Sequence, residues 1–241
     1  MQRVSATLRR PCRRDGLRVL LPMILLVAIL GAATPASAYE VNGCVIEPYT
    51  NCSNKYLGGA WLFSVDMHGA NLSLAFLHLT DLRWANLNNA NLSYASARGA
   101  QFDLATLNHA TLHKIDLRDA SMHFAALHDA NLTFAKMHWT GLIHANLTYA
   151  RLHWAELYST KFNHANLDHA DLRYASFNVT DFRYAQMRHV DLSGVHLGGV
   201  KLTGADLAGA DLTNVNWDYT TCPDGTNSDD NADTCIGHLT V

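Results

Sequence analysis

The hydrophobic and polar positions of this chain alternate with a period of five residues. Every fifth residue from Leu57 to Trp217 is apolar, which makes thirty-three positions in a row without an insertion. A small residue, most often Ala, stands two positions before most of them, and most of the remaining positions are polar. A period of five fits neither the helical repeat of about 3.6 nor the strand repeat of about 2. The pattern therefore predicts an all-β solenoid, in which short extended pieces turn corners and each coil hydrogen-bonds to the next.

The residues that depart from the Ala and Leu pattern indicate how many units make one coil. Thr replaces the small residue at positions separated by multiples of twenty, and Phe recurs at the large position in a twenty-residue phase. The threonines are Thr80, Thr140, Thr160, Thr180 and Thr220, and the phenylalanines are Phe102, Phe162 and Phe182. A narrow tube has little room, so neighbours in one interior column must suit one another in volume. We therefore expect twenty-residue coils of four units, about eight coils, and stacked interior columns of Thr and Phe.

Several units have the order Ala, then Asn or Asp, then Leu, followed by two variable residues. Such units begin at Ala70, Ala90, Ala145, Ala170 and Ala205. This order resembles the pentapeptide repeat family, and the resemblance covers about two-thirds of the chain. The resemblance implies a right-handed quadrilateral β-helix with four units in each coil.

Residues 1–38 have the organisation of an export signal. Six arginines precede an apolar run from Val19 to about Ala33, and Ala36-Ser37-Ala38 has the small-x-small pattern of a signal peptidase site. We expect cleavage after Ala38, export to the periplasm or the exterior, and no membrane span in the mature chain.

Two other interpretations of this segment remain open. A retained membrane anchor is one, although the apolar run is short for a span and Pro22 interrupts it. A twin-arginine signal at Arg13-Arg14 is the other, although the residues that follow match that pattern only in part.

Cysteine usage agrees with export. Cys12 lies in the signal, and the other four cysteines flank the repeats, with none between them. An even number of cysteines in an exported chain indicates disulfides. The simplest pairs are Cys44–Cys52 and Cys222–Cys235, because the other pairings would join the two ends of a long rod.

The expected organisation places one disulfide-closed cap at each end of the solenoid. Open ends of a β-solenoid expose unpaired edges that invite association, and the caps are well placed to cover them. The expected segments are the signal peptide 1–38, an N-terminal cap 39–56, the repeat β-helix 57–219 and a C-terminal cap 220–241.

Histidine is frequent, with 14 in the chain, most of them at outward positions. A twenty-residue coil makes His144 a neighbour of His164, and His169 a neighbour of His189. These pairs are weak candidates for a transition-metal site, and they could make the surface sensitive to acid. Because outward positions accept almost any polar residue, we expect no bound metal.

The tail between Cys222 and Cys235 is rich in Asp and in turn-forming residues. This composition is superficially that of a calcium loop, but the ligand spacing of an EF-hand is missing. A solvated loop closed by a disulfide is the favoured interpretation.

Aromatic residues also fall on outward positions. Tyr94, Phe134, Trp154 and Tyr174 share one twenty-residue phase, so the last three would form a ladder on successive coils. Such ladders stabilise stacked strands. An exposed apolar stripe can instead mark a binding face for a partner protein or a sugar.

Charge and motif content narrow the classes of function. The chain has 18 Lys+Arg and 21 Asp+Glu; removal of the signal leaves 12 basic against 20 acidic residues, a net charge of about −8. A mildly acidic surface disfavours nucleic acid as a ligand. The sequence contains no nucleophile elbow, phosphate loop, zinc-protease helix or dinucleotide fingerprint, so we expect neither an enzyme nor a cofactor.

The sequence thus predicts a non-enzymatic, exported structural or interaction protein that presents a rigid repeat surface to a protein or a surface ligand. The resemblance implies one alternative, a DNA-mimicking partner of DNA gyrase. Export and the arginines mixed with the acids, such as Arg98, Arg173 and Arg183, count against it. A metal- or carbohydrate-binding surface module is a further alternative. The identity of the partner and the oligomeric state do not follow from the sequence.

Overall fold

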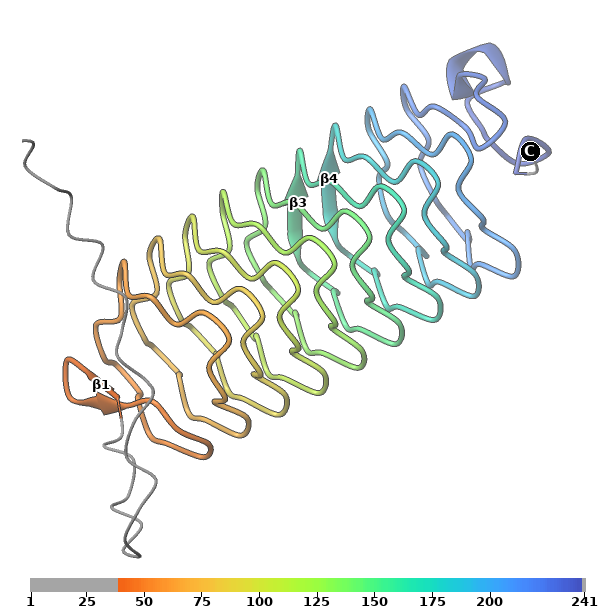
Figure 1. Cartoon of the computed structure of the whole chain (residues 1–241). Helices are drawn as coiled ribbons and strands as arrows, with labels where there is room; N and C mark the ends of the chain where they lie inside the picture. The colour runs from red at the N-terminus through yellow and green to blue at the C-terminus, as the bar shows by residue number, and fades with distance from the viewer. Residues whose placement is uncertain (1–38, 240–241) are drawn as a thin grey trace, which may run out of the picture. The chain divides into compact units, whose positions relative to one another are not determined.

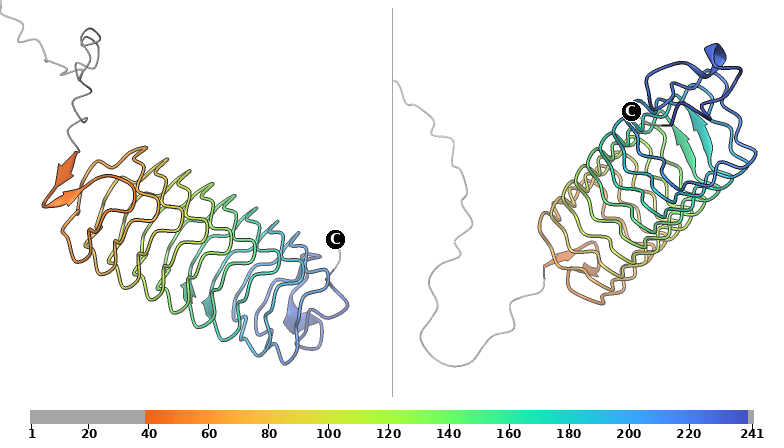
Figure 2. Two further views of the ribbon diagram at one scale, coloured as in Figure 1. Left: turned by 90° about the horizontal axis from the view of Figure 1, so that it is seen from below. Right: turned by 90° about the vertical axis from the view of Figure 1, so that its right-hand side faces the viewer.

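A computed structural model describes residues 39–239 of the chain. Most of this part runs as repeated coils stacked along one axis, seen from three directions in Figures 1 and 2. The regular elements are short: β1 (Glu40–Val41), β2 (Cys44–Val45), β3 (Glu156–Tyr158), β4 (Ser176–Asn178) and the 3-10 helix η1 (Ser228–Asp230). Within residues 39–239, no helix is long and apolar enough to cross a membrane. The prediction of a β-solenoid is confirmed.

The backbone explains why five residues make one unit. Parallel bridges join residues twenty apart, from Asn51↔Asn71 to Lys201↔Thr221, so four units fill one coil. In one unit, the N–H of Leu92 donates to the carbonyl of Thr111 in the next coil at 2.7 Å. The N–H of Ala95 then closes a turn on the carbonyl of Leu92 at 3.0 Å, and Tyr94 within that turn has φ of 60°. Each unit is therefore one bridge to the neighbouring coils followed by one corner.

The large and small apolar positions fill the interior, as predicted. The rings of Phe162 and Phe182 stack at 4.8 Å with an angle of 6° between their planes. The interior threonines are fully buried, and their hydroxyls donate to carbonyls twenty-three residues earlier, as from Thr140 to Leu117 at 2.8 Å. The Thr column and the Phe162–Phe182 stack confirm the twenty-residue phase inferred from the sequence.

The preference for Asn or Asp before the large residue has a local cause. The side-chain oxygen of Asn71 accepts a hydrogen bond from the N–H of Ser73, two residues on, at 3.1 Å. This arrangement is an Asx turn, which supplies a partner for an N–H that the bridges between coils leave free. Asp171 does the same for the N–H of Arg173 at 3.1 Å.

Both predicted disulfides are present. Cys44–Cys52 and Cys222–Cys235 join Cα atoms 5.1 Å and 5.4 Å apart. β1 and β2 form an antiparallel hairpin beside the first disulfide. Cys52 and Cys222 continue the frame of the large interior residues and are fully buried. Bridging from Asn51 to Thr221 thus extends beyond both ends of the expected 57–219 segment. The predicted signal peptide and its cleavage after Ala38 lie outside the described residues.

Candidate binding surface

The corner residue of each unit carries the outward side chains of interest. This residue follows the large position by two and adopts a positive φ, 60° at Tyr94 and 61° at Trp154. The backbone turns there, and the side chain projects away from the tube. Because the same corner recurs every twenty residues, corner side chains on successive coils contact one another.

The predicted aromatic stripe is a continuous stack that we call the aromatic column: Tyr94, Lys114, Phe134, Trp154 and Tyr174. The Phe134 and Trp154 rings lie 6.2 Å apart at 6°, and the Trp154 and Tyr174 rings 4.7 Å apart at 12°. Lys114 fills the place between Tyr94 and Phe134, with its ammonium 5.6 Å and 5.4 Å from the two ring centroids. These distances fit cation–π contacts. Sequence reasoning missed Lys114, although its number places it in the same phase.

A shallow hollow of about 370 Å³ lies beside the aromatic column. Its lining residues are Tyr94, Lys114, Phe134, Lys136, Trp154 and Glu156. Within residues 39–239, neither lysine of this hollow takes part in a salt bridge, whereas Glu156 accepts from His138 at 2.8 Å. Two unpaired ammonium groups next to exposed aromatic edges suit an anionic group on a ligand or a partner.

The histidine candidates meet as predicted, as stacked pairs. His144 and His164 lie 4.9 Å apart at 17°, between Phe124 and Tyr184 in a second corner column. His169 and His189 lie 4.8 Å apart at 10°. A metal ion binds in the plane of an imidazole ring, along a nitrogen lone pair. Nearly parallel rings one above the other therefore do not point their lone pairs at a common ion.

The Asp-rich tail uses its carboxylates within the chain. Asp224 accepts from the N–H and the hydroxyl of Thr226 at 2.9 and 2.7 Å, and lies 2.6 Å from Nδ1 of His238. Hydrogen bonds from the side chain and backbone of Thr226, with a smaller one from His238, lower the pKa of Asp224 to about 2. Across the described residues, no three His, Cys, Asp or Glu side chains gather as a metal site.

A family model for pentapeptide repeats (8 copies) matches residues 85–123, 125–163, 160–199 and 180–216. The chain belongs to the pentapeptide repeat family.

Two solved structures illustrate what this pentapeptide repeat protein is similar to. HetL, a pentapeptide repeat protein involved in heterocyst differentiation regulation from the cyanobacterium Nostoc, is 27% identical, with a TM-score of 0.54. The match covers 75% of this chain and 92% of HetL. Trypsin-treated QnrB1, a plasmid-mediated fluoroquinolone resistance protein, is 21% identical over 66% of this chain and 77% of its own, with a TM-score of 0.48. No curated protein sequence matches the chain.

The outer faces of this pentapeptide repeat protein carry alternating charges. The guanidinium of Arg173 donates to both carboxylate oxygens of Asp171, at 2.9 and 2.8 Å. Burial acts to raise the pKa of Asp171, but the hydrogen bonds and charge of Arg173 outweigh it and hold this pKa below 3.8. The same arrangement recurs in the pairs Arg83–Asp81, Arg118–Asp116 and Arg183–Asp181. Positive and negative charges are therefore neutralised locally on these faces.

Proposed function

We propose that the mature chain is a non-enzymatic, exported interaction protein that presents a rigid repeat surface, with the aromatic column as its binding face. One observation carries the proposal: Lys114 and Lys136 stand without salt bridges, among the residues described, in a hollow beside a stack of exposed rings. Trp154 is 49% exposed although it is the largest side chain of that stack. Aromatic residues are enriched in protein interfaces, and charges at the rim of an interface select a partner of opposite charge.

The stacking favours a protein or an acidic surface ligand over a neutral sugar. Sugars are generally bound on the free face of an aromatic ring. Within the aromatic column, Trp154 lies between Phe134 and Tyr174, and Phe134 lies between Trp154 and the Lys114 ammonium, so among these three rings only the outer face of Tyr174, towards Gly194, is not covered by another member of the column. An acidic segment that contacts ring edges and the two ammonium groups fits this arrangement better.

The gyrase alternative has less support. A protein that imitates DNA needs a surface of uniform negative charge. The ion pairs described above place an arginine next to an acid on several coils, as at Arg118–Asp116 and Arg173–Asp171. Export would also separate the mature chain from a cytoplasmic enzyme.

The proposed compartment rests on the signal-like residues 1–38 and on the two disulfides, which persist in oxidising compartments. We also infer from family membership that the solenoid is right-handed and four-sided, with about eight coils between the caps. N-terminal sequencing of the protein from the exported fraction tests the first point. We expect it to begin at Tyr39; recovery of the intact chain in the cytoplasm would overturn export.

The binding face is tested by capture of partners from the exported fraction with the mature chain. We compare the wild type with Trp154→Ala and Lys114→Met, and use Trp139→Ala as the matched control. Trp139 is 62% exposed but lies on a different corner. Partners retained by the wild type and by Trp139→Ala, but lost from both column variants, support the proposal. Equal capture by all four proteins would contradict it.

A further inference from the structure

The C-terminal end of the solenoid is only partly closed. Beyond Thr221 the chain turns back, and Asn227 pairs antiparallel with Thr221 while Cys222 N–H donates to Thr226 at 2.7 Å. These bonds cover the side of the last coil that carries Thr221. The two sides of that coil formed by residues 205–209 and 210–214 receive no such bonds from the rest of the described chain.

The exposed edge presents a row of free backbone groups. One coil earlier, the N–H groups of Met187, Leu192 and Gly194 donate to the following coil at 2.8, 3.0 and 2.8 Å. Their counterparts in the last coil have no acceptor among the described residues; these are Leu207, Leu212 and Asn214, together with Gly209. The carbonyls of Ala205 and Ala210 likewise lack the donor, among residues 39–239, that their counterparts Ala185 and Val190 have. Such an edge is a template for another extended chain.

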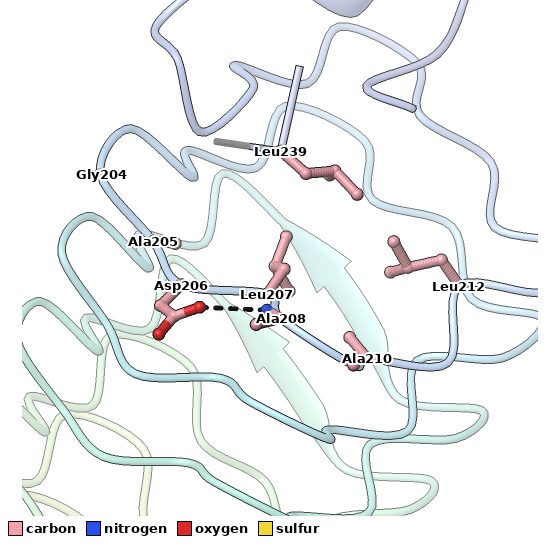
Figure 3. Close-up of a pocket in the computed structure, with 9 residues that line it drawn as sticks. Gly204, Ala205, Asp206, Leu207, Ala208, Ala210, Leu212 and Leu239 are labelled. Atoms are coloured by element: carbon pink, nitrogen blue, oxygen red, sulfur yellow. Dashed lines mark hydrogen bonds between the residues drawn. The ribbon is translucent and has the colours of Figure 1, made fainter. Parts of the chain in front are cut away.

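An apolar hollow of about 490 Å³ adjoins this edge. Leu207, Leu212 and Leu239 point toward one another across it, with Ala210 on its floor (Figure 3). Every other large interior residue from Leu57 to Trp217 is buried, and Leu212 alone in that series is partly exposed. The hollow is therefore the end of the tube's own core that no side chain of residues 39–239 fills.

Charge around the hollow indicates the kind of chain that fits. No Lys or Arg follows Lys201, whereas seven Asp residues do. They are Asp206, Asp211, Asp218, Asp224, Asp229, Asp230 and Asp233. Asp206 and Asp211, at the start of the two uncovered sides, are both exposed. Arg188 lies 3.9 Å from Asp206, whereas Asp211 takes part in no salt bridge among the described residues. Lysine or arginine on an incoming segment would complement this rim.

We propose that the C-terminal edge binds a short extended segment of a partner protein, by strand addition. The segment turns one corner, as the coils themselves do, so that its backbone carbonyls accept from Leu207 and Gly209 on one side and from Leu212 and Asn214 on the next. An apolar side chain enters the hollow, and flanking Lys or Arg side chains meet the Asp rim. This site is separate from the aromatic column, so a negative result at one site does not count against the other.

A second copy of the chain fits the edge less well. Two C-terminal ends facing each other would bring Asp206 and Asp211 of both copies together, which like charges oppose. Head-to-tail stacking would require an open N-terminal end. There, the hairpin held by Cys44–Cys52 covers the part of the first coil beside Tyr56, whose carbonyl accepts from the side chain of Asn42, but the N–H groups of Trp61 and Asp66 have no acceptor among the described residues. A head-to-tail stack of copies is therefore the competing occupant that the sedimentation measurement below distinguishes.

The test uses the full mature chain and a blocked peptide of alternating Lys and Val as the probe. We expect saturable binding and slower hydrogen exchange at the amides of residues 207–214. Leu212→Lys should weaken binding roughly tenfold relative to Thr213→Lys. Both variants add one positive charge to the same five-residue unit, but only the first places it in the hollow. A peptide of alternating Lys and Pro should bind more weakly, because its prolines have no N–H to donate to the carbonyls of Ala205 and Ala210 and their fixed φ disfavours an extended β conformation.

Three outcomes would overturn the proposal. Equal weakening by Leu212→Lys and Thr213→Lys would show that charge alone attracts the peptide. Unchanged exchange at residues 207–214 in the bound state would exclude strand addition. Sedimentation of the chain alone as a dimer, with these amides already protected, would assign the edge to a second copy.

Discussion

The buried hydroxyl of Thr160 donates a 2.6 Å hydrogen bond to the main-chain carbonyl of Met137, twenty-three residues earlier. The same carbonyl also accepts from the N–H of Thr140 at 3.2 Å. A small interior position therefore holds a polar side chain without leaving that hydroxyl unsatisfied, and the bond ties one coil to the preceding one. Thr180 and Thr220 repeat this contact to Leu157 and Leu197.

Replacement of this hydroxyl should cost stability. We expect Thr160→Val to lower the free energy of unfolding by about 1 kcal/mol, since it removes one buried hydrogen bond while keeping the volume. Thr111→Val is the control, because Thr111 lies at an outward position. Chemical denaturation of both variants measures the difference. Equal stabilities would show that the Thr160 bond contributes nothing.

Two corner glycines separate the effect of backbone from the effect of ring packing. Gly194 and Gly204 have φ of 70° and 71°, but only a Cβ at 204 would meet the ring of Tyr184, at 2.5 Å. Ala at either position has the same backbone strain. We expect Gly204→Ala to be less stable than Gly194→Ala by about 1–3 kcal/mol, because the ring must move. Thermal unfolding of the two variants measures this. Restoration by Tyr184→Ala would assign the loss to the ring, and no restoration would contradict it.

Loss of a disulfide should act locally. The Cys44–Cys52 pair closes a short loop, and its removal as Cys44→Ala with Cys52→Ala should destabilise the N-terminal end by about 2–3 kcal/mol. Coils contact only their neighbours, so the effect should fade along the solenoid. Hydrogen exchange should accelerate in residues 39–66 and stay unchanged near Leu152. Removal of Cys222–Cys235 is the control and should accelerate exchange only near the C-terminal end. Uniform acceleration along the chain would contradict the prediction.

The C-terminal cap should loosen in strong acid. The pKa of Asp224 is about 2 in the folded chain, below its ordinary value of 3.8. A depressed pKa contributes stability that is present above 3.8 and is lost as the pH falls toward 2. Hydrogen exchange of residues 222–238 should therefore accelerate between these values. In Asp224→Asn the acceleration should be present already at pH 5, whereas Asp233→Asn should behave as the wild type. Acid sensitivity retained in Asp224→Asn would assign it to another group.

The unbroken series from Leu57 to Trp217 determined most of the architecture without coordinates. Only a backbone that repeats every five residues can place all thirty-three apolar residues inside. The spacing of Thr140, Thr160 and Thr180 likewise determined which positions lie above one another. Export, the right-handed four-sided winding and the number of coils remain predictions.

Tertiary structure decided what the outward side chains do. The repeat permits almost any residue at a corner, so its period shows which corners align but not which side chains contact one another. Lys114 bridges two rings because its flexible stem fits the gap between them. The partial exposure of Leu212 likewise depends on how the tail turns back after Thr221. Interior volume and backbone pairing constrain every unit in the same way, whereas surface contacts and chain ends depend on the particular neighbours that folding brings together.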